Sequence, residues 1–208
     1  IALGSIDTSG HSSTGGRDGG DVDLNAQGAI YTGGTIVTEG GDATNGAGGG
    51  GGSVEFDAYT RLICNAADIT TTGGDADGDA GNGGYINFGD DCIYVSTVAI
   101  RNTGDLITRG GNESGACDEA CRAGSGGPIT FIAVQSGSVA SNATIDTRGG
   151  NSENSTGGGG GELEVRPGAY FESVQAISIY EFSGNITTFG GDGQAGGAGG
   201  PITLRNQG

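Results

Sequence analysis

A phrase that recurs six times constrains this chain more than any other feature. Each copy opens with an apolar residue, a spacer and Thr, continues through a polar glycine-rich loop, and closes with an alternating apolar segment. The openings begin at Ile6, Ile36, Ile69, Leu106, Ile145 and Ile186, a mean period of about 36 residues. Such a period is typical of solenoids, in which each repeat buries its apolar face only against its neighbours.

Alternation within the phrase predicts strands. In Ile36-Val37-Thr38 the Ile and the Thr lie two residues apart, so an extended backbone directs both to one face and Val37 to the other. The closing segment Val54-Glu55-Phe56 repeats this pattern. Glycine disfavours helices by about 1 kcal/mol per residue. We therefore predict an all-β parallel β-helix, or β-solenoid, of about six coils, with glycine-rich loops projecting from one side.

The predicted solenoid is a single domain over residues 1–208. We expect the third strand of each coil at Leu62-Ile63-Cys64, at Val98-Ala99-Ile100, near Val139 and at Ile177-Ser178-Ile179. Glycine runs such as 48–52 and 157–161 have no side chains to separate neighbouring backbones, so we expect the loops to hydrogen-bond from coil to coil. The expected repeats span about 1–29, 30–62, 63–99, 100–138, 139–179 and 180–208.

The net charge of −17, with eight Arg and no Lys, excludes nucleic acid as a partner, because phosphate backbones are bound by positive charge. No apolar run reaches the length of a membrane span. The partners that we expect are further copies of the chain, divalent cations and surface glycans.

Four cysteines allow three pairings. We predict one bridge between Cys64 and Cys92 in neighbouring coils and a local one between Cys117 and Cys121. Paired cysteines indicate an oxidising compartment, so the expected location is extracellular or at the cell surface. Four Asn-x-Ser/Thr sequons begin at Asn112, Asn142, Asn154 and Asn185, and the loop sites Asn112 and Asn154 are expected to be the more accessible.

A calcium site is one interpretation of the third loop. Asp75, Asp77 and Asp79 place carboxylates at alternate positions, and calcium prefers several oxygen ligands at close range. The other interpretation is structural, because Asp and Asn at loop starts commonly close turns onto nearby amides. A column of such residues follows the Gly-Gly pairs, at Asp42, Asp75, Asn112, Asn151 and Asp192.

Catalysis is not expected. The chain lacks the lysine of phosphate-binding loops and Schiff-base sites, and its single histidine is weak support for a catalytic triad. A carbohydrate-active enzyme remains an alternative, because β-helices can carry carboxylate pairs such as Asp23 and Glu55 on an outer face. An ordered Thr column also suggests ice binding, but its residues are expected to point inward.

Taken together, the Ile-x-Thr-x-Gly-Gly opening, the glycine loop and the Gly-Gly-x-Ile-x-Phe closing resemble glycine-rich parallel β-helix repeats of secreted or surface proteins, such as adhesins and autotransporter passengers. The resemblance implies a structural or adhesive role at the cell surface. We expect a subunit that stacks head to tail into a fibre, sheath or surface layer, with an adhesin or ligand-binding stalk as the alternative. The expected assembly edges are Ile6, Thr8, Val22 and Leu24 at one end, and Ile186, Thr188, Ile202 and Leu204 at the other.

Overall fold

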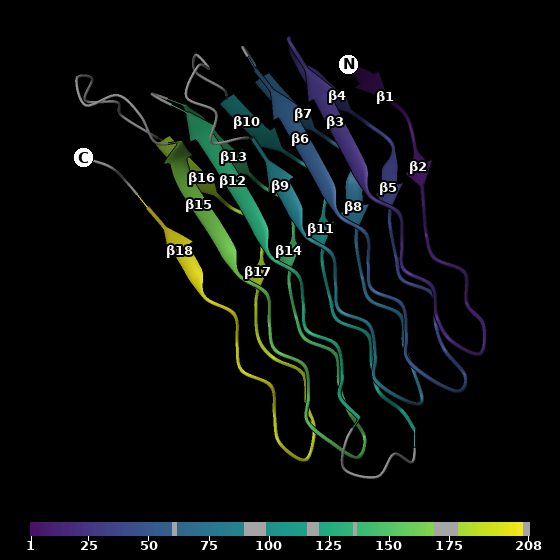
Figure 1. The fold of residues 1–208 in the computed structure, drawn as a ribbon. Helices are drawn as coiled ribbons and strands as arrows, with labels where there is room; N and C mark the ends of the chain where they lie inside the picture. The colour runs from purple at the N-terminus through teal and green to yellow at the C-terminus, as the bar shows by residue number, and fades with distance from the viewer. Residues whose placement is uncertain (60–61, 90–98, 116–120, 135–136, 169–178, 206–208) are drawn as a thin grey trace.

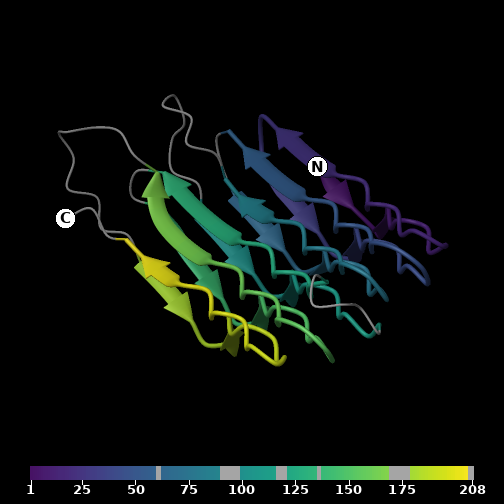
Figure 2. The same ribbon diagram turned by 60° about the horizontal axis from the view of Figure 1, so that its bottom comes forward.

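The protein is a three-sided parallel β-solenoid, as the repeat predicts (Figure 1). The computed structural model describes residues 1–59, 62–89, 99–115, 121–134, 137–168 and 179–205. These residues form strands and contain no helix. Every repeat contributes one strand to each of three six-stranded sheets, and the two termini lie at opposite ends of the stack (Figure 2).

Each sheet collects one side of the solenoid. The first sheet runs in the order β1 (Ala2–Leu3), β4 (Ile30–Thr32), β7 (Leu62–Asn65), β10 (Ala99–Asn102), β13 (Ser138–Ser141) and β16 (Ile179–Phe182). The second runs β2 (Ile6–Asp7), β5 (Thr35–Val37), β8 (Asp68–Thr70), β11 (Leu106–Ile107), β14 (Ile145–Asp146) and β17 (Ile186–Thr187). The third runs β3 (Val22–Ala26), β6 (Val54–Ala58), β9 (Ile86–Phe88), β12 (Ile129–Val134), β15 (Leu163–Gly168) and β18 (Ile202–Leu204).

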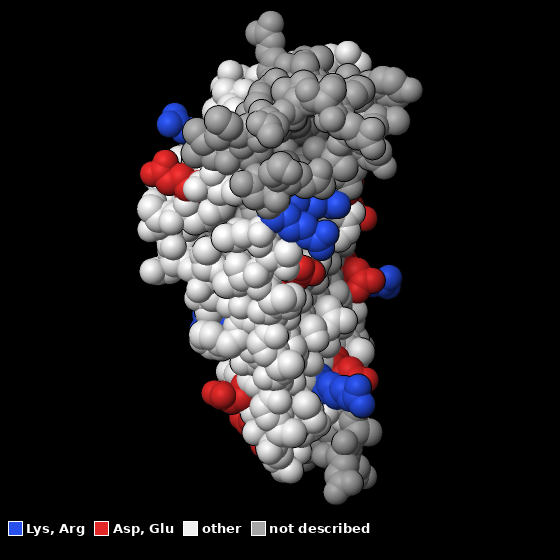
Figure 3. Space-filling model, turned by 90° about the vertical axis from the view of Figure 1, so that its left-hand side faces the viewer, with Lys and Arg blue, Asp and Glu red and all other residues white. Residues whose placement is uncertain are grey.

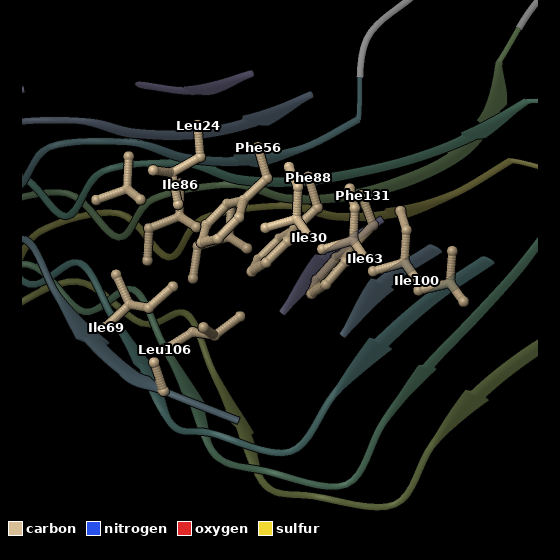
Figure 4. Close-up of a cluster of buried hydrophobic side chains, with 14 of the residues drawn as sticks. Leu24, Ile30, Phe56, Ile63, Ile69, Ile86, Phe88, Ile100, Leu106 and Phe131 are labelled. Carbon is tan, nitrogen blue, oxygen red and sulfur yellow. The ribbon is translucent and has the colours of Figure 1, made fainter. Parts of the chain in front are cut away.

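The register stacks like residues on like. In the third sheet Phe56 pairs with Phe88, and Phe88 with Phe131. Their side chains are fully buried, and successive rings stack with centroids 4.7 and 5.0 Å apart. Isoleucines and leucines from the other two sheets fill the remaining space between the walls (Figure 4). One narrow apolar core therefore runs along the rod.

The strands of the first sheet lie at the segments predicted as the third strand of each coil. Ile30, Ile63, Ile100 and Val139 align in one inward column of this sheet. Val139 then pairs with Tyr180, which packs against the core, so a tyrosine continues this column in the last repeat. Of the predicted segments, residues 98, 177 and 178 lie outside the described part of the chain. A tyrosine at this position escapes a search for aliphatic alternation.

All six glycine-rich loops leave the solenoid on the same side and lie one behind the next (Figure 1). Each has an outgoing limb, which follows the opening Thr, and a return limb, which leads to the third sheet. In the third repeat Gly73 of the outgoing limb donates to Arg109 of the next repeat at 2.9 Å, and Gly83 of the return limb donates to Ser125 at 2.9 Å. The limbs also bond to each other, since Gly84 donates to Thr71 at 2.7 Å.

Close approach of these backbones explains the glycine content. A Cβ on Gly81 would lie 1.8 Å from the carbonyl oxygen of Gly49, and one on Gly84 would lie 2.1 Å from that of Gly52. These two glycines are three residues apart, which is the period of a polyproline II helix. Among the described glycines only Gly46 and Gly89 have positive φ. Most loop glycines are thus required for packing rather than for an unusual backbone conformation.

Candidate functional site

The Thr column closes the base of each loop. Thr8, Thr38, Thr71, Thr108, Thr147 and Thr188, here called the Thr ladder, donate through Oγ1 to the carbonyls of Gly20, Gly52, Gly84, Gly127, Gly161 and Gly200 at 2.6–2.9 Å. The four inner members of the ladder are fully buried. The hydroxyls are therefore used internally, as their inward orientation predicts, and present no flat outer plane to ice.

The proposed calcium ligands do not converge. Asp75 accepts from the backbone amide of Asn112, Asp79 accepts from that of Arg122, and Asp77 accepts from the hydroxyl of Ser114. Among the described residues there is no group of three or more His, Cys, Asp or Glu side chains that could hold a metal. The structure therefore does not gather these three carboxylates into one ligand set, because each bonds separately to the neighbouring repeat.

The column that contains Asp75 satisfies backbone amides between repeats. Each side-chain oxygen accepts the amide of the next column member at 2.6–2.9 Å. The backbone amide of Asp75 donates to the side chain of Asp42, that of Asn112 to Asp75, that of Asn151 to Asn112, and that of Asp192 to Asn151. We call these residues the Asx column. Its bonds link successive coils instead of closing the local turns that the structural interpretation expected.

The cysteines fall into two groups. Cys64 is a free thiol, which contradicts the predicted bridge to Cys92. In register, Cys64 faces Tyr31 on one neighbouring strand and Arg101 on the other, so no cysteine adjoins it within the first sheet. Cys121 is disulfide-bonded. Cys92 and Cys117 lie outside the described residues.

All four sequon asparagines, Asn112, Asn142, Asn154 and Asn185, are exposed. Two of them, Asn112 and Asn154, also use their side-chain nitrogens as donors, to Asp75 at 3.2 Å and to the carbonyl of Gly115 at 2.9 Å. The greater accessibility of the loop sites stays a prediction.

The structure also brings together residues that the sequence did not single out. Asp146 lies on the outward side of β14, yet its side chain is only 4% exposed because Arg109 and Arg148 cover it. Arg109 donates Nε to its carboxylate at 2.8 Å and also donates Nη2. Arg148 donates Nε at 3.0 Å and Nη2 at 2.9 Å. Two guanidinium groups thus share one buried carboxylate.

The charge of Asp146 depends on these arginines. Burial opposes ionisation of the carboxyl, but the hydrogen bonds from Arg109 and Arg148 outweigh that effect and hold the pKa of Asp146 below its ordinary value. Asp146 is therefore ionised in the folded protein at neutral pH. It fixes both guanidinium groups in place.

A pocket of about 300 Å³ opens beside the two arginines. Its floor is made by Gly-Gly pairs of the outgoing limbs, and we call it the basic groove. Phe189 occupies the position equivalent to Arg148 in the next repeat, and 59% of its surface is exposed. Its ring centroid lies 5.5 Å from the Arg148 guanidinium carbon. The polar and aromatic side chains that line the groove are Arg109, Arg148, Phe189, Asn112, Asn151 and Asp192. On the face shown in Figure 3, arginines are few and lie near carboxylates.

The sequence feature that indicates this groove is the residue directly after the ladder threonine of each repeat. That position is Ser9, Glu39 and Thr72 in the first three repeats, and Arg109, Arg148 and Phe189 in the last three. Along the chain this position changes from small or acidic residues to basic and aromatic ones. The columns that predict the fold are those whose residues recur, so a change along one column carries no weight in that prediction.

A second unpredicted feature is a buried polar ladder at the junction of the first and second sheets. Asn65 donates to Asn102 at 2.6 Å, and Asn102 donates to Ser141 at 3.1 Å. Thr32 begins the ladder by donating to Asn65 at 2.5 Å. Because these side chains are used in hydrogen bonds between coils, we assign the ladder a structural role.

Comparison with known proteins gives no relative: no family model, no curated protein and no solved structure matches the chain. No helix among the described residues is long and apolar enough to cross a membrane. The function must therefore be argued from the rod, its two ends and the basic groove.

Proposed function

We propose that this chain is an extracellular structural β-solenoid that stacks head to tail into a fibre, sheath or surface layer. The observation that carries the proposal is the exposure of β18. Ile202 is 50% exposed and Leu204 60% exposed, whereas Leu163 and Val165, their partners on β15, are fully buried. A further coil on this edge would bury both side chains as every inner coil does.

The opposite end offers the complementary edge. Val22 and Leu24 on β3 occupy the same two columns as Ile202 and Leu204, and β1, β2 and β3 each pair on one side only. Open strand edges are templates for pairing with another chain. A stacked copy would continue all three sheets and the apolar core.

The loops would supply a specific hydrogen bond at the contact between two stacked copies. Along the Asx column the side-chain oxygen of one repeat accepts the backbone amide of the next, and Ser12 precedes Asp42 in that column. In a stack, the Ser12 amide of one copy would donate to Asp192 of the copy before it. The two patches differ, so the contact is heterologous and propagates into an open filament unless its rotation closes a ring.

A surface location agrees with the disulfide-bonded Cys121, because disulfides persist in oxidising compartments. The adhesin and autotransporter resemblance points the same way but is not supported by any detected relative. We keep the ligand-binding stalk as a second candidate function, because the basic groove combines basic and aromatic side chains outside the core.

Light scattering after size exclusion, with negative-stain electron microscopy, tests the stacking. We expect mass to rise with concentration and filaments one solenoid wide to appear. Thr203→Pro with Thr187→Lys on the last coil should give monomers, because proline removes a ladder donor and lysine charges the edge. Thr130→Lys, on the outward side of the inner strand β12, is the matched control and should still assemble. A wild-type protein that stays monomeric at high concentration would exclude the fibre.

A further inference from the structure

We propose that the basic groove binds a hexuronate, a six-carbon sugar acid, with its carboxylate on Arg109 and Arg148 and its ring against Phe189. This binding site would lie on the loop layer, and its far end, at Phe189 and Asp192, belongs to the last coil, next to one of the two stacking edges. It goes beyond the structural role and does not depend on it, because every residue that lines the groove comes from one chain.

Charge points to a carboxylate ligand. One guanidinium group would neutralise the buried Asp146, and the structure supplies two, so the cluster of these three side chains keeps one surplus positive charge in a chain of net charge −17. Asp192, at the last-repeat end of the groove, is a carboxylate in the lining, so the ligand carboxylate is placed at the arginine end. The same overall charge repels long polyanions such as nucleic acids. A ligand with one carboxylate on an otherwise neutral polar body fits both conditions.

Both guanidinium groups keep donors for a ligand. Each uses Nε and Nη2 toward Asp146, which leaves Nη1 and the second Nη2 hydrogen without a partner in these bonds. The side chains of Arg109 and Arg148 are 43% and 36% exposed, so these donors reach solvent. Since Asp146 already fixes both side chains, binding an anion here costs little rotamer entropy.

The rest of the groove suits a sugar better than a simple anion. Phe189 offers an exposed ring beside the arginines, and an aromatic face packs against the apolar face of a sugar ring. Asn151 uses its side-chain oxygen for the Asp192 amide, while its NH2 group has no hydrogen bond among the described residues and can donate to a hydroxyl. The Gly-Gly floor lets a ring approach the backbone closely.

An NMR titration of the 208-residue protein tests the proposal, with methyl α-D-galacturonoside as the probe. Methyl α-D-galactoside is the matched neutral ligand, because it differs only in having a hydroxymethyl group in place of the carboxylate. Acetate is the matched anion without a sugar ring. We expect shifts of the Arg109 and Arg148 Nε–H resonances and a dissociation constant on the order of 1 mM for the uronate. Binding of the galactoside and of acetate should be at least tenfold weaker.

Variants separate the two parts of the site. Phe189→Ala should weaken uronate binding about tenfold and leave acetate binding unchanged, because it removes the ring that packs on Arg148 and keeps every hydrogen bond between the arginines and Asp146. Arg148→Gln should abolish both, with the dispersion of core amides checked to show that the fold is kept. Arg101→Gln, on an exposed outer position of the first sheet, is the control and should bind as wild type.

Three results would overturn the proposal. The first is equal affinity for the uronate and the galactoside. The second is equal affinity for the uronate and acetate, with no effect of Phe189→Ala. The third is no binding of the uronate at a ligand concentration ten times the expected dissociation constant. Every residue that lines the groove comes from one chain, so failure here leaves the stacking proposal standing. Failure of stacking likewise leaves the binding proposal standing.

Discussion

At the residue scale, small polar side chains hold successive coils and loop limbs together. Threonines bond across the base of each loop, and Asp and Asn side chains accept amides from the next repeat. This explains how a strongly acidic chain folds without lysine. Many of its carboxylates serve as acceptors for backbone amides that a sheet ladder does not reach.

We expect Thr108→Val to destabilise the protein. The substitution keeps the shape but removes the Oγ1 donor and leaves the Gly127 carbonyl without that bond at a buried position, which costs about 1–2 kcal/mol. Urea unfolding measures the loss. Thr130→Val, on the outward side of β12, is the control and should change stability by no more than about 0.5 kcal/mol. Equal effects would show that the Thr ladder has no special role.

A pH-dependent stability difference should trace to Asp146. Because the arginines lower the folded-state pKa, this carboxylate stabilises the protein above the unfolded value of 3.8, and the contribution is lost as pH falls through the folded value. Asp146→Asn should therefore lower stability at neutral pH and flatten the decline in stability as pH falls below 3.8.

Thermal unfolding across this acid range measures the effect. Asp192→Asn, which changes an exposed carboxylate of the last repeat, provides the control and should retain the wild-type slope. A slope for Asp146→Asn as steep as that of the wild type would contradict the assigned role of the arginine pair.

At the element scale, the loop limbs pack as tightly as the strands. Gly124 shows how little room there is, because a Cβ would lie 1.8 Å from the Gly81 carbonyl oxygen and 2.9 Å from the Gly111 nitrogen. Both neighbours are backbone atoms, so no side-chain rotation can relieve the contact. The limb must move as a whole or separate from its neighbour.

Gly124→Ala should therefore cost roughly 3 kcal/mol in urea unfolding. Gly159 in the same layer gives a matched comparison, since its nearest heavy atom would be the Ser125 Oγ at an ordinary 3.6 Å. Gly159→Ala should be neutral or stabilising by up to about 1 kcal/mol, because alanine restricts the unfolded chain. If both variants are equally stable, the loops are not packed as the structure shows.

At the scale of the whole molecule, the sequence was sufficient for the architecture. Strict spacing of the Ile and Thr columns predicts the strand phase, and the stacked Phe56, Phe88 and Phe131 follow from it. The register of the last repeat on the first sheet did not follow from the sequence, because Tyr180 takes the place that aliphatic residues hold in the inner repeats. Periodicity predicts what recurs and is weakest where a repeat departs from its neighbours.

The basic groove could not be predicted in the same way. Arg109 and Arg148 are 39 residues apart in sequence, and they meet only because stacking places the same loop position of adjacent repeats side by side. Stacking also separates the residues of the calcium interpretation. Alternate carboxylates along one loop look like a ligand set, but stacking pairs each of them with the next repeat.

The central claim is that the glycine loops form a hydrogen-bonded layer continuous with the sheets. Amide hydrogen exchange by NMR tests it most directly at Gly83 and Gly126, whose amides donate to the next repeat at 2.9 and 2.8 Å. We predict protection comparable to that of Ile129 in the core strand β12, with fast exchange at Gly15, which donates no backbone bond among the described residues. Exchange of Gly83 and Gly126 as fast as Gly15, while Ile129 stays protected, would contradict the account.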